Sequence, residues 1–497
     1  MKFPITLTHR KHTASFRIVG SMLAIAPLCL MLAAANTSAY GQMSGNVSNS
    51  ASSPSPADWT QFLRDNMQRW NASETVLGIN NVGNLHLKWK NPIGPYFDYV
   101  LSSPAVVNGV VYFGSDNGIL HALNASTGAT LWNFNTGNIV VSSPAVANGI
   151  VYIGSYDGNL YALSAATGTK LWSFATQGAI SFSSPTVANG VVYIGSNDHS
   201  VYALNASTGE KLWSYATGDA VEASPAVANG AVYVPSDDGN VYALNASTGA
   251  KLWNYTIGPG AGESYMTSSP SVANGVVYVG SGLDSSLHAL DAGTGTRLWS
   301  YSTGSVIKYA STSVANGVVY IGCFDGSVHA VNASTGTLRW KYLTGAQAWS
   351  SPAVANGVVY VGSLDGNVYA LNASTGAKLW SYNTAGNLIS SPSIVDGVLY
   401  VRAGYENFAI GGAGTGNIYA FAPGSADLFL RITPSLTTVH QGDLLTYAFP
   451  VWDLGPANAD HEALNTQVPA GTTFDYIRIS GTPGLSTCTH PPYQRTG

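Results

Sequence analysis

One thirteen-residue segment, Ser-Pro-Ala-Val-Ala-Asn-Gly-Val-Val-Tyr-Val-Gly-Ser, recurs with small changes through the middle of the chain, at steps of 40 to 45 residues. Its second position marks eight places: Pro104, Pro144, Pro185, Pro225, Pro270, Thr312, Pro352 and Pro392. A fixed period of this length indicates a propeller or solenoid, because one repeat is a supersecondary unit that buries its apolar surface only against its neighbours.

Each unit has the pattern of four short strands, and the seventh shows it most clearly. Asn356-Gly357 suits a tight hairpin turn because both residues tolerate positive φ. Asp365-Gly366 gives a second turn and 374–376 a third, and the segments between them are rich in β-branched and aromatic residues. The predicted strands are 351–354, 358–363, 367–372 and 377–383. Four strands in about forty residues predict a propeller blade.

The end of each unit carries a second pattern, Ala-x-Asn-x-x-Thr-Gly-x-x-x-Trp. Its tryptophans are Trp132, Trp172, Trp213, Trp253, Trp299, Trp340 and Trp380. A ring of this size buries roughly 150–250 Å² and suits the docking of one blade on the next. The eighth unit lacks such a strand, whereas an orphan Leu85-His86-Leu87-Lys88-Trp89 precedes the first. We therefore predict an all-β, eight-bladed propeller whose ring is closed by this N-terminal strand, because closure removes open sheet edges.

These two motifs resemble the PQQ-repeat propellers, a family that includes the quinoprotein alcohol dehydrogenases and BamB, the propeller subunit of the outer-membrane assembly machinery. The resemblance covers about 58–423, and Asp58-Trp59-Thr60-Gln61-Phe62 is similar to the start of bacterial members. It implies the fold much more strongly than an activity.

The first residues have the layout of a secretory signal peptide, 1–41. Lys2, Arg10, Lys11 and Arg17 precede an apolar run, 18–35, and small residues near Ala39 and Gly41 mark the expected cleavage sites. An uncleaved anchor is the alternative. Residues 42–57, rich in Ser, Asn, Gly and Pro, are predicted to be a flexible linker. We therefore expect a secreted, periplasmic or cell-surface protein with no membrane span after removal of the signal.

The residue pattern of the sequence changes at Ala426, after which no forty-residue unit follows. Segments 427–432, 444–449 and 468–474 suggest strands and turns. Residues 426–497 resemble a partial Ig-like repeat of bacterial surface proteins, short of the roughly hundred residues of a full sandwich. We expect a small incomplete β-sandwich here, either because the chain is incomplete or because its end is frayed.

Composition excludes some partners. Only 9% of the residues are charged and the net charge is −5, without a basic cluster beyond the N-terminus. Nucleic-acid binding is therefore not expected, since it needs clustered Lys and Arg. The monomeric propeller is expected to bind a protein, a peptide or a surface polymer.

Removing the repeated residues leaves the positions that vary. Strands alternate in direction, so the turns between the second and third strands and the crossings between blades share one face, which we call the variable face. Three residues before the marker position lie Leu101, Val141, Phe182, Glu222, Thr267, Tyr309, Trp349 and Ile389. The candidate ligand-binding residues are Asp98, Tyr99, Asp219, Glu222, Glu263, Tyr265, Lys308, Tyr309, Trp349, Arg402, Glu406 and Asn407. Aromatic rings mixed with a few polar groups at a concave mouth are typical of a ligand site, although loops are also variable without one.

Other polar residues have plainer interpretations. The Ser-x-Asp-Gly turns at Asp157, Asp238, Asp325 and Asp365 supply one carboxylate per blade, whereas calcium needs six to eight oxygens together. His121, His288 and His329 stand where other blades have Tyr, so we interpret them as aromatic substitutes rather than ligands. Cys323 replaces a Ser and is predicted to be a buried thiol. No metal site and no catalytic residue are predicted.

The function predicted from the sequence is that of an exported, non-catalytic binding or scaffolding module. The alternatives are a quinoprotein dehydrogenase that holds PQQ and calcium, and a BamB-like factor in outer-membrane protein assembly. The resemblance implies a vicinal cysteine pair for the dehydrogenases, which this chain lacks, so no cofactor is expected. The absence of a lipid-attachment cysteine weakens the BamB-like alternative.

Overall fold

The protein is described by a computed structural model. It describes residues 2–7, 12–20, 55–56, 58–64, 67–96, 101–258, 268–404, 414–424, 428–430, 433–434, 444–453, 462–467, 472–480 and 487–488. The chain divides into two compact units: Asn49–Pro423, and Met1–Ser48 together with Gly424–Gly497.

The first unit is a ring of eight antiparallel four-stranded sheets, which confirms the predicted propeller. The innermost strands are β5 (Ala105–Val107), β9 (Ala145–Ala147), β13 (Thr186–Ala188), β17 (Ala226–Ala228), β21 (Ser271–Ala273), β25 (Ser313–Ala315), β29 (Ala353–Ala355) and β33 (Ser393–Val395). The second strands are β6 (Val110–Gly114), β10 (Ile150–Gly154), β14 (Val191–Ser196), β18 (Ala231–Pro235), β22 (Val276–Ser281), β26 (Val318–Gly322), β30 (Val358–Gly362) and β34 (Val398–Ala403).

The third strands are β7 (Ile119–Asn124), β11 (Asn159–Ser164), β15 (Ser200–Asn205), β19 (Asn240–Asn245), β23 (Ser286–Asp291), β27 (Ser327–Asn332), β31 (Asn367–Asn372) and β35 (Gly414–Pro423). The outer strands are β8 (Thr130–Asn135), β12 (Lys170–Ala175), β16 (Lys211–Ala216), β20 (Lys251–Thr256), β24 (Arg297–Ser302), β28 (Leu338–Leu343), β32 (Lys378–Asn383) and β4 (Leu85–Tyr96). We number the blades 1 to 8 in the order of β5 to β33.

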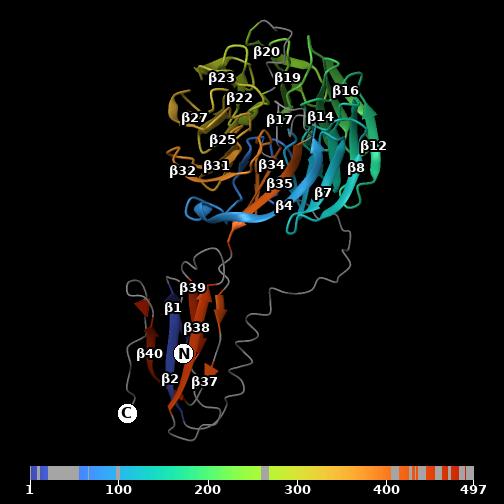
Figure 1. Ribbon diagram of the computed structural model, residues 1–497. Helices are drawn as coiled ribbons and strands as arrows, with labels where there is room; N and C mark the ends of the chain where they lie inside the picture. The colour runs from blue at the N-terminus through green and yellow to red at the C-terminus, as the bar shows by residue number, and fades with distance from the viewer. Residues whose placement is uncertain are drawn as a thin grey trace. The chain divides into compact units, whose positions relative to one another are not determined.

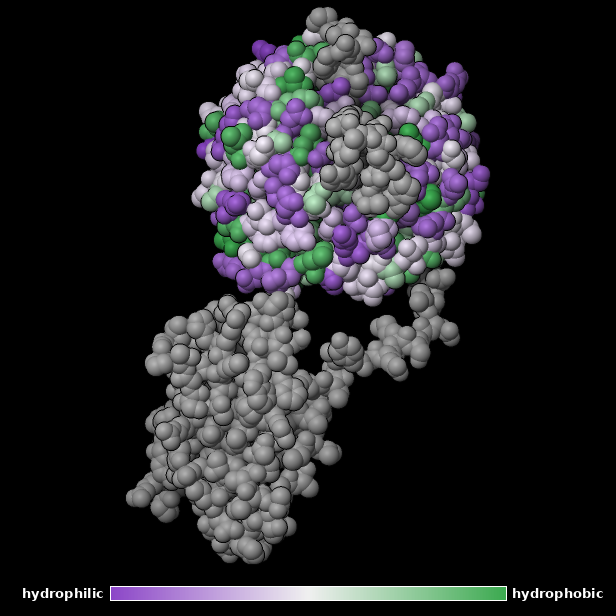
Figure 2. All heavy atoms as spheres, viewed as in Figure 1, coloured by the Kyte–Doolittle hydropathy of each residue, from purple (hydrophilic) through white to green (hydrophobic). Residues whose placement is uncertain are grey.

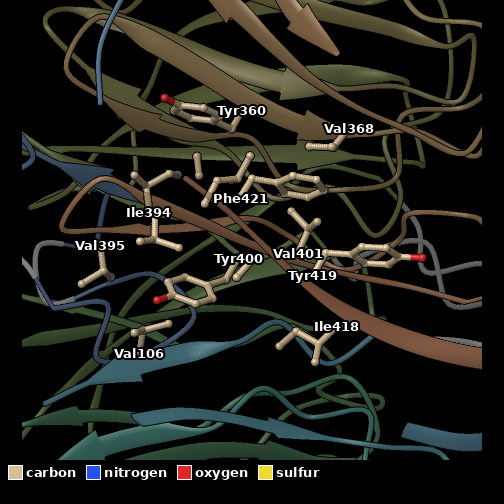
Figure 3. Close-up of a cluster of buried hydrophobic side chains, with 14 of the residues drawn as sticks. Val106, Tyr360, Val368, Ile394, Val395, Tyr400, Val401, Ile418, Tyr419 and Phe421 are labelled. Carbon is tan, nitrogen blue, oxygen red and sulfur yellow. The ribbon is translucent and has the colours of Figure 1, made fainter. Parts of the chain in front are cut away.

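Blade 8 is completed by the N-terminal strand, as the orphan tryptophan segment predicts. β4 pairs antiparallel with β35, and Trp89 stands opposite Ala420. Figure 1 shows β4, in blue, beside β35, in orange, although the two are far apart in sequence. Blade 8 packs between its neighbours through Ile394, Tyr400 and Phe421, which share one buried cluster with Tyr360 of blade 7 and Val106 of blade 1 (Figure 3).

The tryptophans join each blade to the next. The indole Nε1–H of each donates to a backbone carbonyl of the following blade at 2.9–3.1 Å. The acceptors of Trp89, Trp132, Trp172, Trp213, Trp253, Trp299, Trp340 and Trp380 are Ala125, Ala165, Ala206, Ala246, Ala292, Ala333, Ala373 and Leu85. This packing requires the glycine of the repeated motif. Gly128 has φ +72°, and a Cβ there would lie 2.6 Å from the ring of Trp89.

A ring of serine hydroxyls joins the inner strands. The backbone N–H of one serine donates to the Oγ of the serine in the next blade, with N···Oγ distances of 2.8–3.0 Å. The bonds run in order through Ser103, Ser143, Ser184, Ser224, Ser269, Ser311, Ser351 and Ser391, and then back to Ser103. These serines directly precede the marker positions, so one repeated residue forms the whole ring.

The described residues 58–64 and 67–74 form a plug that lies across the inner strands at one end of the channel, which the sequence did not reveal. Backbone N–H groups of Val106, Val146, Val272, Val314 and Val354 donate to the carbonyls of Trp59, Thr60, Met67, Gln68 and Arg69. Within the plug, β3 (Trp70–Asn71) runs parallel to β29. Asn71 donates to the carbonyl of Ile394 in blade 8, and Leu63 packs with Ala226 of blade 4.

Arg69 holds the plug against blades 7 and 8. Its guanidinium is fully buried and donates to the carbonyls of Pro352 and Pro392, each at 3.0 Å, and to that of Phe62. The only helix among the described residues is the 3₁₀ turn η1 (Val82–Asn84), between the plug and β4. No described helix has the length and apolar character needed to cross a membrane.

The outer surface of the propeller is mixed in character. On the face seen in Figure 2, apolar residues form small areas scattered among polar ones. Exposed leucines recur on the outer strands, for example Leu131 and Leu252, next to the docking tryptophans.

The second unit contains two sheets. One has the order β39 (Glu462–Gln467), β1 (Lys2–Leu7), β41 (Thr487–Cys488). The other has the order β36 (Leu428–Leu430), β38 (Leu444–Asp453), β2 (His12–Gly20), β40 (Thr472–Ser480), and β37 (Thr433–Pro434) pairs with β38. The Ig-like assignment of 426–497 stays a prediction, as does the signal peptide. If cleavage removes the N-terminal residues, β1 and β2 are absent from the mature chain.

The first prediction concerns that cleavage. We expect the intact mass of the exported protein to correspond to a chain that begins at Tyr40 or Gln42, because a positive segment followed by an apolar run directs removal after Ala39 or Gly41. A mass that retains Met1 would contradict the signal peptide and support β1 and β2 as parts of the mature sheets.

The second prediction concerns closure. Trp89→Ala removes a partly buried indole and its hydrogen bond to Ala125, so we expect the free energy of unfolding to fall by about 3 kcal/mol. Urea denaturation followed by far-UV circular dichroism measures it. Leu131→Ala, on an exposed position of β8, is the control and should stay within about 0.5 kcal/mol. Equal effects of the two changes would contradict the role of Trp89.

Candidate functional site

A pocket opens in the channel on the variable face, above the serine ring. Its empty volume is about 440 Å³, part of it open to solvent. Seven of its lining residues come from the serine ring, and the others are Phe62, Leu101, Val141, Phe182, Tyr309 and Ile389. The plug supplies Phe62, and the positions three before the marker supply the wall. The pocket is therefore apolar at its sides and polar at the serine ring.

Two aromatic rings that line the pocket come from opposite sides of the channel and lie close to each other. The centroids of Phe182, in blade 3, and Tyr309, in blade 6, are 5.5 Å apart. Tyr309 has φ +67°, a left-handed conformation that is unfavourable for a bulky residue. Strained backbone of this kind is found disproportionately at functional sites.

Tyr309 begins an aromatic cluster, which we define as Phe182, Tyr309, Phe324 and Trp349. Ring centroids are 5.1 Å apart for Tyr309 and Trp349, and 5.0 Å for Phe324 and Trp349. The Lys308 ammonium lies 5.1 Å from the centroid of Tyr309. All four rings are partly exposed, so the cluster presents aromatic surface at the mouth. Aromatic pairs at these distances stabilise one another.

Acidic residues lie around the same mouth. Asp116, Glu222 and Asp237 are each less than a tenth exposed. The Ser181 hydroxyl donates to Asn197 Oδ1 at 2.8 Å, and Glu222 Oε1 lies 3.3 Å from Ser181 Oγ. Burial raises the pKa of Tyr156 to about 12, and the negative charges of Glu222 and Asp116 act in the same direction. Tyr156 therefore keeps its hydroxyl proton, and the two carboxylates lie close enough to raise its pKa.

The structure brings together four of the candidate residues predicted from the sequence: Glu222, Lys308, Tyr309 and Trp349. Asp219 lies to the side, where His199 Nε2 is 3.6 Å from its Oδ1. Six others lie outside the described residues: Asp98, Tyr99, Glu263, Tyr265, Glu406 and Asn407.

The assignment of Arg402 to the exposed rim is wrong. Arg402 is fully buried at the junction of blades 8 and 1, and its Nη1 donates to the carbonyls of Ser102 and Gly114. Its guanidinium lies 4.8 Å from the ring centroid of Phe113. It occupies the place of the glycine in Gly-Ser, so it seals the junction between the last and first blades.

The sequence interpretation missed a second ring of variable positions, the x of Ser-x-Asp-Gly. It includes Asp116, Tyr156, Asn197, Asp237, Phe324 and Leu364. The backbone N–H of Phe324 donates to Val306 O at 3.1 Å, and that of Tyr156 to Ile139 O at 3.0 Å, so these residues lie against the crossings between blades. Comparing the repeats at this position would have identified them.

The aspartates of the same turns serve the turns themselves, and in blade 6 Asp325 Oδ1 accepts a hydrogen bond from the backbone N–H of Ser327 at 2.9 Å. Asp157, Asp238 and Asp365 each accept a hydrogen bond from the tyrosine four residues later, at 2.5–2.6 Å. In blade 5, His288 Nε2 lies 2.9 Å from Asp284 Oδ2. These interactions explain the aspartates without calcium.

Comparison with known proteins agrees with this architecture. Three overlapping stretches, 67–220, 197–349 and 325–422, match the family described as outer membrane protein assembly factor BamB. They span more than half of the chain, which therefore belongs to this family of PQQ-repeat propellers. No curated protein gives a significant sequence match.

Solved structures share the fold. The quinohemoprotein alcohol dehydrogenase of Pseudomonas putida HK5 is 20% identical, with a TM-score of 0.65 over 74% of this chain and 80% of that one. The corresponding enzyme of Comamonas testosteroni is 19% identical, with a TM-score of 0.63 over 76% and 83%. BamB of Moraxella catarrhalis is 21% identical, with a TM-score of 0.56 over 68% and 97%. At these identities the likeness shows the fold alone.

Proposed function

We propose that this chain is an exported, non-catalytic binding module that takes a peptide segment of a partner protein at the mouth of its channel. The observation that carries the proposal is the aromatic cluster, two of whose rings line a pocket with apolar sides and a polar serine ring, beside nearly buried carboxylates. A concave apolar site with a few polar groups is the usual form of a ligand site.

The pocket suits one side chain of such a segment. Leu101, Val141 and Ile389 offer apolar contact at the sides. The serine hydroxyls below accept N–H groups of their neighbours and keep their own protons for donation. An apolar or aromatic side chain that displaces the Phe182–Tyr309 pair would bury its surface there and gain about 25 cal/mol per Å².

The mouth suits a basic residue beside that side chain. Asp116, Glu222 and Asp237 supply negative charge, and the rings of Tyr309 and Trp349 offer faces to a cation. A desolvated cation over an aromatic face gains about 2 kcal/mol. We therefore favour a peptide that carries a Lys or Arg next to a large apolar residue. A surface polymer without cationic groups would use the rings alone.

Membership of the BamB family supports a role at the cell envelope, and the predicted signal peptide supports export. The matching family is described as an outer membrane protein assembly factor, which makes help in outer-membrane protein assembly the second candidate.

PQQ does not fit the residues at the mouth. It is a tricarboxylate, whereas Asp116, Glu222 and Asp237 are acidic and their charge would oppose it. Phe182 and Tyr309 also meet across the channel. These three carboxylates do not converge, within the part of the chain that the structure describes, on one ion-sized position. We derive no oxidation step for this chain.

The third prediction tests the mouth. A fluorescein-labelled peptide, selected against the full-length protein from a random display library, should bind Trp349→Ala and Glu222→Gln at least about tenfold more weakly than the parent protein, a loss of about 1.4 kcal/mol. Fluorescence anisotropy measures the Kd. Added salt should weaken binding to the parent, because part of the attraction is electrostatic.

Leu343→Ala is the matched control, since this residue of the outermost strand β28 is 66% exposed and is not among the residues that line the pocket. Its Kd should equal that of the parent. Peptides that bind all three variants alike would contradict the proposal.

The fourth prediction concerns the dehydrogenase alternative. With PQQ and calcium added, we expect neither a rise in thermal midpoint nor reduction of an electron-accepting dye with a panel of alcohols. A clear response in both measurements would overturn the non-catalytic proposal.

A further inference from the structure

Blade 6 departs from the repeat at three positions that lie together. Cys323 stands where Ser155, Ser196 and Ser363 stand in other blades, and His329 stands where they have tyrosine. Lys341, on β28 opposite His329, takes the place of a small polar residue. A histidine also occurs at the position of His329 in blades 1 and 5, and blade 8 has Lys90 at the position of Lys341, so the combination with Cys323 is what distinguishes blade 6.

The departures form a set of metal-ligating groups. One ligand atom each of Cys323, Asp325 and His329 lie within 4.8 Å of one another, the only such group among the described residues. Cys323 and His329 are each 1% exposed, whereas Asp325 reaches solvent. The three groups are therefore accessible to solvent on the side of Asp325 and buried on the side of Cys323 and His329.

His329 has a nitrogen without a partner. Its Nδ1 lies 3.0 Å from the Tyr301 hydroxyl of blade 5, while the buried Nε2 has no hydrogen-bond partner. The Nε2 atoms of the equivalent histidines have partners, although Nδ1 of His288 is also buried without one. His121 Nε2 is 3.0 Å from Ser115 Oγ, and His288 Nε2 is 2.9 Å from Asp284 Oδ2. A buried nitrogen left unpaired carries a desolvation cost, and it requires a reason.

We propose that Cys323, Asp325 and His329 bind a divalent cation of the zinc class, with Cys323 Sγ, an Asp325 oxygen and His329 Nε2 as ligands and water in a fourth position. Thiolate and imidazole ligands select zinc, cobalt or cadmium over calcium and magnesium. Nδ1–H donation to the Tyr301 oxygen fixes the tautomer that presents Nε2, a usual outer-shell arrangement.

The geometry needs only a small contraction. Zinc bonds of about 2.0–2.3 Å place tetrahedral ligand atoms about 3.3–3.8 Å apart, so the side chains must close by about 1 Å. Lys341 Nζ holds Asp325 Oδ2 at 2.9 Å. It must release this oxygen, which its 41% exposed side chain allows by turning into solvent. On binding, the Cys323 S–H bond breaks, the sulfur–metal bond forms and the proton leaves to water.

The site would stiffen the turn that carries Phe324. Phe324 lies between two of the ligands in sequence and contacts Trp349 in the aromatic cluster. This inference does not depend on the proposed function, because it concerns the interior of one blade.

The fifth prediction tests metal binding in the full chain with Cys29→Ser and Cys488→Ser, so that Cys323 is the only thiol. Cadmium should add a thiolate-to-metal absorption band in the ultraviolet, at one ion per chain, and zinc should abolish it by competition and raise the thermal midpoint. Cys323→Ser and His329→Tyr restore the residues of other blades and should keep the fold. Each should weaken binding by more than the about 10–100-fold that outer-shell partners contribute.

Two further variants give the inference its controls. His288→Tyr makes the same change in blade 5, where Ser281 replaces the cysteine, and should leave binding unchanged. Tyr301→Phe should weaken binding by about 10–100-fold. Absence of the band, or equal binding by His329→Tyr and His288→Tyr, would overturn the proposed site.

Discussion

Eight backbone N–H groups donate to eight serine hydroxyls around the channel, and the last bond returns to the first serine. This closed circuit depends on the number of blades, because one sheet more or fewer would change the radius at which the serines meet. The tryptophan hydrogen bonds also join each blade to the next, at a larger distance from the channel. Trp380 donates to Leu85 and Trp89 to Ala125, so both junctions of blade 8 use the interaction that joins every other pair. Blade 8 therefore has four strands like the other blades, and the edges of its sheet are the innermost strand β33 and the outermost strand β4.

The plug adds hydrogen bonds to the inner strands and also shapes the site. Because residues 58–64 and 67–74 bond to inner strands around the ring, they lie across one end of the channel. Phe62 then forms part of the pocket at the other side. Among the described residues, the pocket thus lies between the plug and the variable face, which is where we expect a ligand to enter. The same chain segment that bonds to the ring therefore lines part of the proposed site.

Most of the fold could be predicted from the sequence, since the repeat is local. The period and the four strands of each blade follow from patterns within about forty residues, and the partner of the Trp89 strand follows from the missing fourth strand of the eighth unit. The plug could not be predicted, because Trp59 and Arg69 bond to strands far along the chain through backbone groups that leave no sequence pattern. For the site, comparison of repeats identified Glu222, Tyr309 and Trp349. It could not tell that Arg402 is buried, since the comparison detects a departure from the repeat but not the direction of the side chain.

Departures from the repeat have two physical causes, and the structure separates them. Blade 8 differs because it meets the chain's own start. Arg402 takes the place of a glycine there, and its guanidinium donates to the carbonyls of Ser102 and Gly114. Contacts within the protein therefore explain this substitution. Blade 6 has ordinary neighbours on both sides, with the same serine and tryptophan bonds as the rest. Closure of the ring therefore does not require its cysteine and histidine, and His329 Nε2 has no hydrogen-bond partner. A departure that closure does not require, and that leaves a buried donor or acceptor unsatisfied, is the kind that a bound ion would explain.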